Sequence, residues 1–596
     1  MNQIDLKKII EAKQKNVFKN VPQPIVSLII RFLQRLMHVR EINEILARAK
    51  DKKGFEFIEE LFDYLDFSFL LSGKDRRKIP AEGRLVIVSN HPLGALDGLA
   101  LLRAIGEVRP DVKIVVNDVL SKIENLGDLF LPYDIFTLKA QKQNIKDIER
   151  ALSEERAVVF FPSAEVSRFG PQGIVDGKWH KGAVHFARKM ESPILPLFVK
   201  GRNSIMFYAV SLLHRAFSMF LLPREIFLKK SRNITIRVGD PIPASNVKKD
   251  IVNTKTMANL LKDHVYRIGR GKKGVFKTEK TVIHPVCKAL LKKELSRATL
   301  LAETADGRKT YAVKYEHGKN VIREIARLRE LTFRKVQEGT GDKMDMDHYD
   351  RFYTHIVLWD DNALEIMGSY RLVVYEDIWN TADKQSIYTE TLFDYTNDFE
   401  SYVRNSVELG RSFIQYKYWK SQALDMLWKG IGLYLNSRPN ARFLFGSVSI
   451  SHSYPEEAID LIVFYYNKWY QSEAQLAIAK NRYSISPERE KNLRALLNGN
   501  DFEEDYRILK GLLKNYGYAV PVLFRQYSML VQFGGMKMVD FCVDRSFNTV
   551  DGLILIDIER MEPRKRERYH LANRGDSSKT NESVFIPPID TQPVTV

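Results

Sequence analysis

One segment organises the first half of the sequence: Leu85-Val-Ile-Val-Ser-Asn-His-Pro-Leu-Gly-Ala-Leu-Asp-Gly98. Its first four residues form a short apolar, β-rich run of the kind that a parallel sheet buries on both faces. The run ends in a polar turn, and an apolar helix is expected to begin near Gly98. Asn90 and His91 follow the carboxyl end of the strand, where open α/β sheets bind their ligands. The segment therefore predicts a ligand site at this turn.

Asp97 lies six positions after His91, close enough across a turn for its carboxylate to hold the imidazole. A histidine oriented by a carboxylate is suited to take a proton from an attacking hydroxyl group. The alternative interpretation is structural: Asp97 is the N-cap of the helix and His91 is an ordinary loop residue. A second segment favours the catalytic interpretation.

This second segment is Ala157-Val-Val-Phe-Phe-Pro-Ser-Ala-Glu-Val-Ser-Arg168, an apolar strand that breaks at a proline into a polar loop. Further on, Pro193-Ile-Leu-Pro-Leu-Phe-Val199 is another short strand interrupted by prolines. Together the three segments resemble the glycerolipid acyltransferase family. That family carries an Asn-His block with a nearby Asp, a Phe-Pro-Glu-Gly-type block with a following Arg, and a late Pro-Ile-x-Pro strand. The blocks occur here in the same order.

The resemblance implies that His91 is the general base, that Asp97 holds it, and that Asn90, Glu165 and Arg168 contact the acceptor. An Arg side chain can grip a phosphate or carboxylate in bidentate fashion; the alternative for Glu165 and Arg168 is a surface ion pair. Two features depart from the family. Five residues separate His91 from Asp97 where the family usually has four, as in its haemolysin-like branch, and a Ser-Ala-Glu run ending at Glu165 displaces the usual Glu-Gly pair.

Length and composition limit the class of protein. A chain of 596 residues is too long for one ordinary core, so two or more domains are expected. The hydrophobic content of 44% and the charged content of 28% are typical of a globular protein. The net charge of +18 fits anionic lipid headgroups or an acidic carrier protein. Zinc spacings and nucleic-acid motifs are not found, so neither a metal nor nucleic acid is expected, and two distant cysteines indicate a reducing compartment.

The sequence predicts contact with a membrane surface without a span. Residues 24–39 are interrupted by Arg31 and Arg35, and residues 205–222 by His214 and Arg215. A span needs about 20 apolar residues with few charges. We therefore expect amphipathic helices in the headgroup region; the alternative is that they are ordinary core helices. Since a signal peptide is not apparent either, we expect a peripheral protein on the cytoplasmic face of the inner membrane.

Alternating strand and helix patterns from Arg84 onward are typical of an α/β fold with a largely parallel sheet. Residues 1–75 are expected to be helical, including 55–71, and the resemblance implies that they form a membrane-facing platform. We assign an O-acyltransferase domain to residues 76–268 and a linker rich in glycine and lysine to 269–289. The expected strands are 113–116, 157–161, 194–199 and 234–238, and the expected helices are 144–152 and 182–190.

The second half presents an arginine-containing helix, an acidic loop, a hairpin, a strand with a Glu-x-x-Arg motif, a further helix and a further strand. The arginine-containing helix is expected at residues 321–334, the acidic loop at 342–350, and the two hairpin strands at 355–359 and 366–374. The strand with the Glu-x-x-Arg motif is expected at 408–414, followed by a helix that runs through residue 428 and a strand at 443–450. This order resembles the acyl-homoserine-lactone synthase and ornithine-acyl-carrier N-acyltransferase branch of the N-acetyltransferase fold. The segment Asp544-Arg-Ser-Phe-Asn-Thr-Val-Asp551 also looks like the ornithine enzymes. We expect this α/β domain over residues 290–562 and a disordered tail over 563–596.

The second resemblance implies that five residues shape an acceptor pocket for an amino acid: Asp345, Asp350, Arg371, Glu408 and Arg411. Carboxylates can bind an ammonium group while an arginine binds a carboxylate; the alternative for each Asp alone is a solvated loop residue. The Gly-rich loop that grips the pyrophosphate of coenzyme A does not follow Phe413. We expect no bound cofactor and an acyl donor that is a thioester of acyl carrier protein or coenzyme A. The positive chain would steer an acidic carrier protein.

Both halves together resemble bifunctional ornithine-lipid synthases. The second half would attach a 3-hydroxyacyl chain to the α-amine of an amino acid, and the first half would esterify the 3-hydroxyl with a second fatty acid. Three alternatives remain: a single acyltransferase for lysophosphatidic acid with a binding module, a synthase for a soluble acylated signal, and a membrane scaffold. The sequence does not separate ornithine, glycine and lysine as the amino acid.

Overall fold

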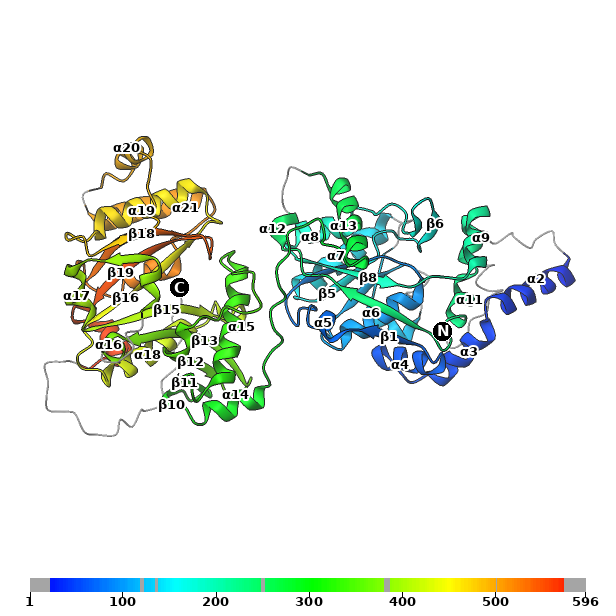
Figure 1. Cartoon of the computed structure of the whole chain (residues 1–596), viewed down its shortest axis with the longest axis horizontal. Helices are drawn as coiled ribbons and strands as arrows, with labels where there is room; N and C mark the ends of the chain where they lie inside the picture. Colours follow the sequence, from blue (N-terminus) through cyan, green and yellow to red (C-terminus); the bar gives the residue numbers. More distant parts are fainter. Residues whose placement is uncertain are drawn as a thin grey trace. The chain divides into compact units, whose positions relative to one another are not determined.

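The computed structural model describes residues 22–117, 123–133, 138–247, 252–379, 386–499 and 501–572. This described chain forms two compact units that divide between His284 and Pro285, inside the predicted linker (Figure 1). Each unit has its own sheet and hydrophobic core. The first 21 residues of the predicted helical segment lie outside the described residues, and so does the predicted tail from residue 573 onward.

The first unit is built on seven described strands in the order β1-β9-β8-β2-β5-β3-β4. Neighbours pair in parallel except β8 and β9, which are antiparallel. The predicted α/β fold with a largely parallel sheet is therefore confirmed. The strands are β1 (Ser68–Leu71), β2 (Leu85–Ser89), β3 (Lys113–Val116), β4 (Phe130–Pro132), β5 (Ala157–Phe160), β8 (Ile194–Lys200) and β9 (Asn233–Val238), with a separate hairpin of β6 (Arg168–Gly170) and β7 (Gly173–Val175).

Helices cover both faces of this sheet, and β2 contributes to both cores. Leu85 and Ile87 pack with α4 and α6, whereas Val86 and Val88 pack with α7, α8 and α13. Alternate side chains point to opposite faces of a strand, so a continuous apolar run suits this central position. The helices are α2 (Gln23–Leu36), α3 (Val39–Arg48), α4 (Gly54–Tyr64), α5 (Gly73–Arg76), α6 (Ala95–Gly106), η2 (Glu124–Leu129), α7 (Leu138–Ser153), α8 (Gly182–Lys189), α9 (Ile205–Leu213), α10 (Arg215–Met219), α11 (Leu222–Phe227), α12 (Ala244–Val247) and α13 (Thr254–Gly269).

The prediction of helix through Leu71 is wrong. The helix α4 ends at Tyr64, and Asp66 has a φ of 44°, which turns the chain out of the helix. Residues 68–71 then form β1 and pair in parallel with β9. The partner strand lies more than 150 residues further along the chain, so the local helical pattern does not reveal the pairing.

The predicted membrane-contacting segments form short helices. Residues 24–39 fall on α2 and the start of α3, and residues 205–222 fall on α9, α10 and the start of α11. Across the described part of the chain, every helix is too short or too polar to cross a membrane.

Residues at the end of the first unit pack back onto it. Thr281 donates its hydroxyl hydrogen to the Lys78 carbonyl at 2.7 Å, and Nε2 of His284 lies 3.0 Å from the Ile79 carbonyl oxygen. Much of the segment assigned to a linker is therefore fastened to the first unit.

The second unit contains an eight-stranded sheet among its described residues, in the order β10-β11-β12-β13-β15-β16-β19-β18. The predicted hairpin is confirmed as β12 and β13, which pair antiparallel. The strands are β10 (Thr299–Glu303), β11 (Arg308–Val313), β12 (Thr354–Asp360), β13 (Glu365–Val374), β15 (Ser406–Ile414), β16 (Phe443–Ser451), β18 (Met536–Asp544) and β19 (Thr549–Asp557), and β14 (Phe393–Tyr395) pairs with β17 (Ala477–Ala479) separately.

Helices of the second unit lie on both sides of its sheet (Figure 1). The core against α18 and α19 is the larger cluster and includes Trp428, while a second cluster around Phe399 and Phe445 lies on the other face. The helices are α14 (Lys288–Leu295), α15 (Lys319–Lys335), η3 (Tyr349–Arg351), α16 (Tyr375–Trp379), η4 (Tyr388–Thr391), α17 (Asn397–Val403), η5 (Tyr416–Tyr418), α18 (Ala423–Asn436), α19 (Glu456–Tyr470), α20 (Pro487–Leu496), α21 (Phe502–Asn515), α22 (Val522–Ser528), η6 (Ile558–Arg560) and α23 (Pro563–Arg568).

The strands β15 and β16 are the parallel pair in this otherwise antiparallel described sheet. Their described ladder has three residue pairs, from Ser406 with Phe443 to Glu408 with Phe445. Beyond that point β16 continues to pair with β19 as far as Ser451. The strand β15 therefore no longer pairs with β16 at Arg411, although it remains in the sheet through its pairing with β13.

The predicted tail begins too early. Residues 563–568 form α23, and Tyr569 and Leu571 are buried in the core of the second unit. Tyr569 lies against Trp428, with ring centroids 5.7 Å apart, and Arg568 forms an ion pair with Asp425 at 2.7 Å. The polar composition of this segment hides these two apolar anchors.

Candidate active sites

The turn after β2 is tighter than the sequence predicts. The helix α6 begins at Ala95, and Gly94 occupies its N-cap position with a φ of 96°, a conformation that favours glycine. Asp97 therefore lies in the first turn of α6, and its assignment as the N-cap is wrong. The early start of the helix turns the Asp97 carboxylate toward His91.

His91 and Asp97 are in contact. Nδ1 of His91 lies 3.0 Å from Oδ1 of Asp97, an ion pair whose angle falls short of a hydrogen bond. Asp97 is fully buried, and its Oδ2 accepts the Leu93 N–H at 2.8 Å. Burial disfavours the charged imidazolium, but the Asp97 carboxylate outweighs burial and raises the pKa of His91 above its ordinary value. Because Nδ1 faces Asp97, Nε2 is the nitrogen that can take a proton from an acceptor.

A second carboxylate, Asp176, holds the turn around His91. It accepts the His91 backbone N–H at 3.2 Å, the Ser167 hydroxyl at 2.5 Å and the indole N–H of Trp179 at 2.9 Å. Asp176 also contributes to the raised pKa of His91. Asp176 follows β7, 85 positions from His91, so its contact with the turn is not apparent from the sequence.

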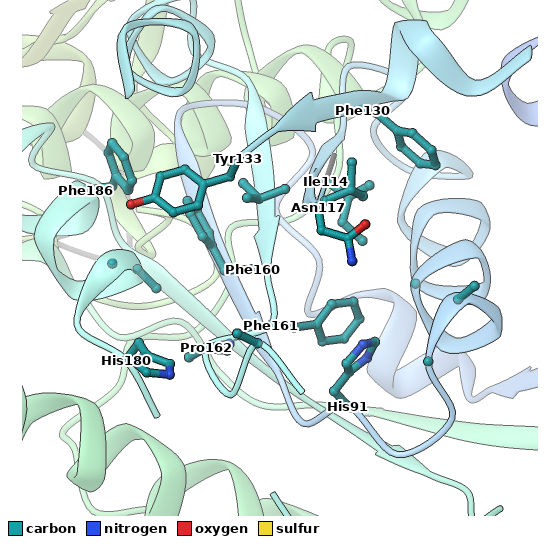
Figure 2. Close-up of a pocket in the computed structure, with 18 of the residues that line it drawn as sticks. His91, Ile114, Asn117, Phe130, Tyr133, Phe160, Phe161, Pro162, His180 and Phe186 are labelled. Atoms are coloured by element: carbon teal, nitrogen blue, oxygen red, sulfur yellow. The ribbon is translucent and has the colours of Figure 1, made fainter. Parts of the chain in front are cut away.

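A cavity of about 640 Å³ lies beside His91 (Figure 2). The His91 ring stacks on Phe161, with ring centroids 3.9 Å apart. Most of the other lining residues are apolar, among them Ile114, Leu126, Phe130, Phe160 and Phe186. A largely apolar lining with a few polar groups is typical of a site for a hydrophobic ligand, and here the polar residues are His91, Asn117, Tyr133, His180, Lys181 and His185.

Asn90 serves the scaffold around this cavity. Its side-chain N–H donates to the Val199 carbonyl at 2.9 Å, and its Oδ1 accepts the Val199 N–H at 2.7 Å. These two bonds fasten the end of β2 to β8. Asn90 is buried and is not part of the cavity lining, so a direct contact with substrate remains a prediction.

Glu165 lies on the loop that follows β5, and Arg168 begins the strand β6. Nε of Arg168 lies 3.4 Å from Oε2 of Glu165, and the Glu165 side chain is 56% exposed. The guanidinium donates to the hydroxyls of Ser211 on α9 and Ser218 on α10. Arg168 therefore ties the loop to the helices that carry exposed apolar residues.

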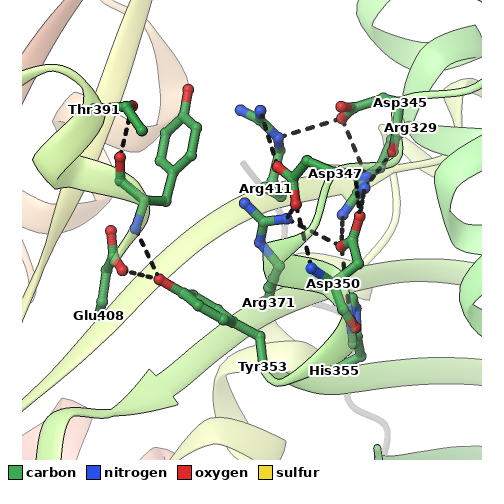
Figure 3. A network of polar contacts seen from close by, with 11 residues as sticks. Arg329, Asp345, Asp347, Asp350, Tyr353, His355, Arg371, Thr391, Glu408 and Arg411 are labelled. Atoms are coloured by element: carbon green, nitrogen blue, oxygen red, sulfur yellow. Dashed lines mark hydrogen bonds and ion pairs between the residues drawn. The ribbon is translucent and has the colours of Figure 1, made fainter. Parts of the chain in front are cut away.

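The second unit brings Asp345, Asp350, Arg371 and Arg411 together in one network, while Glu408 bonds separately to Tyr353 (Figure 3). Arg329 of α15 binds Asp350 through two hydrogen bonds of 2.9 and 2.8 Å, and Arg371 of β13 binds the same carboxylate at 3.0 Å. Burial opposes a charge on Asp350, but the two arginines outweigh it and keep the pKa of Asp350 well below its usual range. His355 lies against this carboxylate, and burial lowers the pKa of His355 to about 4.

Arg411 extends the network toward the diverging strands. Its Nε lies 3.4 Å from Asp345, and its terminal nitrogen lies 3.5 Å from Asp347. The guanidinium lies over the rings of Tyr388 and Phe547, at 4.4 and 4.2 Å from the centroids. Arg411 also has a φ of 48°, which few residues other than glycine adopt. The backbone is held in a strained conformation that presents this side chain.

Glu408 is fully engaged within the protein. One carboxylate oxygen accepts the Tyr353 hydroxyl, and the other accepts the Thr389 N–H at 2.8 Å. Burial raises the pKa of Glu408 above its ordinary value. Glu408 therefore orders the loop at Thr389 beside Arg371 and Arg411.

Sequence reasoning did not single out Arg329, Asp347 and His355 as site residues. Arg329 is fully buried, although a charged residue on a helix is ordinarily exposed. The sequence feature that could identify Arg329 is its position on the apolar side of the predicted helix at 321–334, because a buried arginine needs a buried partner.

Comparisons with known proteins match both units. Residues 13–267 match the acyltransferase family, and residues 328–429 match the acetyltransferase (GNAT) domain. The chain is 31% identical to the glycine N(alpha)-acyltransferase of Bacteroides thetaiotaomicron, over 52% of this chain and 97% of that protein. It is 30% identical to the lyso-glycine lipid O-acyltransferase of Phocaeicola vulgatus, over 44% of this chain and 95% of that protein. The chain belongs to the aminolipid acyltransferases.

A third relative extends the range of amino acids in this family. The L-ornithine N(alpha)-acyltransferase of Rhodobacter capsulatus is 26% identical, over 44% of this chain and 95% of that protein. Each relative therefore spans about half of the present chain. This aminolipid acyltransferase is bifunctional: it joins an acyltransferase domain to a GNAT domain, and it transfers acyl groups from a thioester donor.

Proposed function

We propose that the second unit N-acylates an amino acid with a 3-hydroxyacyl chain and that the first unit esterifies the 3-hydroxyl with a second chain. The observation that carries the proposal is the pair His91 and Asp97 beside an apolar cavity, in a chain that also contains a GNAT domain. The amino acid is proposed to be glycine, because the relatives that act on glycine share more identity with this chain than the ornithine enzyme does.

In the first reaction step assigned to His91, Nε2 takes the proton of the 3-hydroxyl as the oxygen attacks the thioester carbonyl. Asp97 stabilises the imidazolium that forms. The carbon–sulfur bond then breaks, and the thiolate leaves with the proton that His91 returns. The apolar cavity beside His91 is proposed to hold an acyl chain, which places the thioester at the imidazole.

The network of the second unit supports recognition of an amino acid. Arg371 forms short ion pairs with Asp347 and Asp350, at 2.6 and 3.0 Å, which suits a structural role. Arg411 makes longer ion pairs, at 3.4 and 3.5 Å, and its Nε, like that of Arg371, has no hydrogen-bond acceptor among the described residues. Arg411 is therefore proposed to bind the carboxylate of the amino acid, with Arg371, Asp345, Asp350 and Glu408 holding the site in place.

The donor is proposed to be an acyl carrier protein thioester, with coenzyme A as the alternative. The net charge of +18 favours an acidic partner.

The same charge favours anionic lipids, and exposed apolar side chains on the first unit support a membrane-facing surface. On α2 these are Leu28 and Phe32, 69% and 66% exposed, and at the end of α9 they are Leu212 and Leu213, 67% and 87% exposed. Leu36 of α2 packs against the cluster that contains Phe207 of α9, so the two helices belong to one surface. We propose that this surface binds the cytoplasmic face of the inner membrane peripherally.

Lipid mass spectrometry tests the proposal in a bacterial host that makes no aminolipids and expresses the intact chain. The expected product is a lipid with an amide-linked hydroxyacyl chain and an ester-linked acyl chain on glycine, and its mass identifies the amino acid. If no aminolipid forms and the chain instead rescues a host defective in glycerolipid acylation, the first unit acts on lysophosphatidic acid. Product in the medium instead of the membrane would support a soluble signal.

A further inference from the structure

Two carboxylates outside the network of Figure 3 meet on one face of the second unit's sheet. Ser449 of β16 is paired directly with Asp551 of β19 in the antiparallel ladder, so the two side chains lie on the same face. The Ser449 hydroxyl donates to Oε2 of Glu338 at 3.2 Å, which brings Glu338, from the segment after α15, onto that face. The fold thus joins residues more than 200 positions apart.

Asp551 has an unused acceptor in this position. The residue is 6% exposed, and its Oδ1 has no hydrogen-bond partner among the described residues. An unpaired buried carboxylate oxygen is costly, so native proteins rarely keep one without a ligand, a water molecule or a catalytic role. The free oxygen indicates that a hydrogen-bond donor binds here.

A cation lies at the other end of the same site. Asp551 interacts electrostatically with Arg411, which is itself stacked between Tyr388 and Phe547. An α-amino acid carries its ammonium and carboxylate groups on a single carbon. A carboxylate pair close to an arginine matches both groups, because the arginine can bind the carboxylate while the acidic pair binds the ammonium.

We propose that Glu338 and Asp551 bind the α-ammonium group of the amino-acid substrate and act as the general base of the N-acylation. This assignment rests on the proposed function of the second unit. An ammonium proton passes to the carboxylate pair, and the free amine attacks the thioester carbonyl carbon. As the carbon–sulfur bond breaks, the thiolate takes the second proton from nitrogen, and the pair releases its proton to solvent. The products are the amide and the thiol.

The electrostatics of the pair fit this role. Burial raises the pKa of Glu338 and that of Asp551 to about 7 in each case; the Asp551 charge adds to the rise at Glu338, and the Asp544 charge adds to the rise at Asp551. A base whose pKa lies near the working pH accepts and releases a proton readily. The charged and titratable groups that face the pair are Asp544 and Cys542 of β18, Arg411 of β15, Tyr388 of η4 and Tyr454 after β16.

Glu408 is the rival for this role, because it is the acid of the Glu-x-x-Arg motif. Both of its oxygens already accept hydrogen bonds from Tyr353 and Thr389. Asp551 retains a free oxygen, which favours the new pair as the base.

Steady-state N-acylation by the full chain tests the assignment, with glycine and a 3-hydroxyacyl thioester of acyl carrier protein as substrates. In Asp551→Asn and Glu338→Gln we expect kcat to fall about a hundredfold, within the range for loss of a general base. The wild-type rate should fall below about pH 7 as the pair takes up a proton, and the variants should lose this inflection and recover rate at alkaline pH.

Two exposed carboxylates of the same unit serve as matched controls. Asp394 and Glu559 form surface ion pairs with Lys480 and Arg442, so Asp394→Asn and Glu559→Gln should keep the wild-type rate and pH profile. Thermal unfolding identifies any variant that fails to fold. If wild type N-acylates glycine and the two test variants keep kcat within twofold with the same pH profile, the assignment is overturned and the proposed function stands. If wild type makes no amide, the proposed function itself fails.

Discussion

His91, the proposed base, owes its raised pKa chiefly to a neighbour that comes only six residues later in the chain. Asp97 is buried in the first turn of α6 and is fixed by the Leu93 N–H. The carboxylate keeps the pKa of His91 above its ordinary value despite burial. A general base works in its neutral form, so esterification should fall as the pH decreases through this raised pKa.

Changing Asp97 to Asn tests this coupling. Removal of the charge takes away the main influence that raises the pKa of His91, so the rise of kcat/KM with pH should move to lower pH. The rate of O-acylation at its plateau should fall about a hundredfold, because the imidazolium loses its stabilising partner. The measurement is a pH–rate profile with a lyso-aminolipid and an acyl thioester.

Asp63 provides the control for this variant. It is an exposed carboxylate on α4, and Asp63→Asn should leave both the rate and the profile unchanged. An Asp97→Asn profile that coincides with wild type would remove Asp97 from the mechanism.

At the scale of elements, α2 and α9 carry the exposed apolar side chains of the first unit. Phe32→Glu and Leu213→Glu each place a charge where we propose that lipid binds. Burial of one large apolar side chain contributes about 1.5–3 kcal/mol to the free energy of binding, so the affinity of each variant for vesicles should fall about tenfold to a hundredfold. The assay is co-sedimentation with vesicles that contain phosphatidylglycerol.

A matched control variant for vesicle binding lies in the second unit. Leu496 is 49% exposed on α20, and Leu496→Glu should bind vesicles as wild type does. Equal loss of binding in all three variants would argue against a dedicated surface on α2 and α9.

The elements that could be predicted from the sequence are those whose patterns lie within one short segment of the chain. The apolar run of β2 and the short spacing from His91 to Asp97 identify the first site, and the hairpin of β12 and β13 follows from two strand patterns near each other. The strand β1 was missed because its partner β9 is distant in sequence.

The residues of the candidate sites can also be predicted where they are close in sequence and cannot be predicted where only the fold brings them together. Asp176 lies far from His91 in the sequence, and Glu338 meets Asp551 only through the pairing of β16 with β19. Sequence spacing carries no information about such contacts. The buried arginine Arg329 is the exception, because its place on an apolar helix face indicates an acidic partner.

The whole molecule joins an acyltransferase domain to a GNAT domain, and we propose that the two act in sequence on one product. If the hydroxyl esterified by the first unit is the one introduced by the second, His91→Ala should stop the pathway after the amide. We expect the monoacylated aminolipid to accumulate and the diacylated lipid to disappear in a host that expresses this variant. Lipid mass spectrometry measures both species, with Asp63→Asn as the control. An unchanged lipid profile would refute the role of the first unit.

Burial of Tyr569 and Leu571 in the core of the second unit has a consequence for biosynthesis. The ribosome makes about 5–20 residues per second, and domains fold as units from the N-terminal side. The first unit ends at His284, so it can complete its fold while the second is still being translated. The second unit must wait for its last two anchors, nearly 300 residues later. During each round of synthesis the unit proposed to esterify is therefore ready before the unit proposed to make its acceptor.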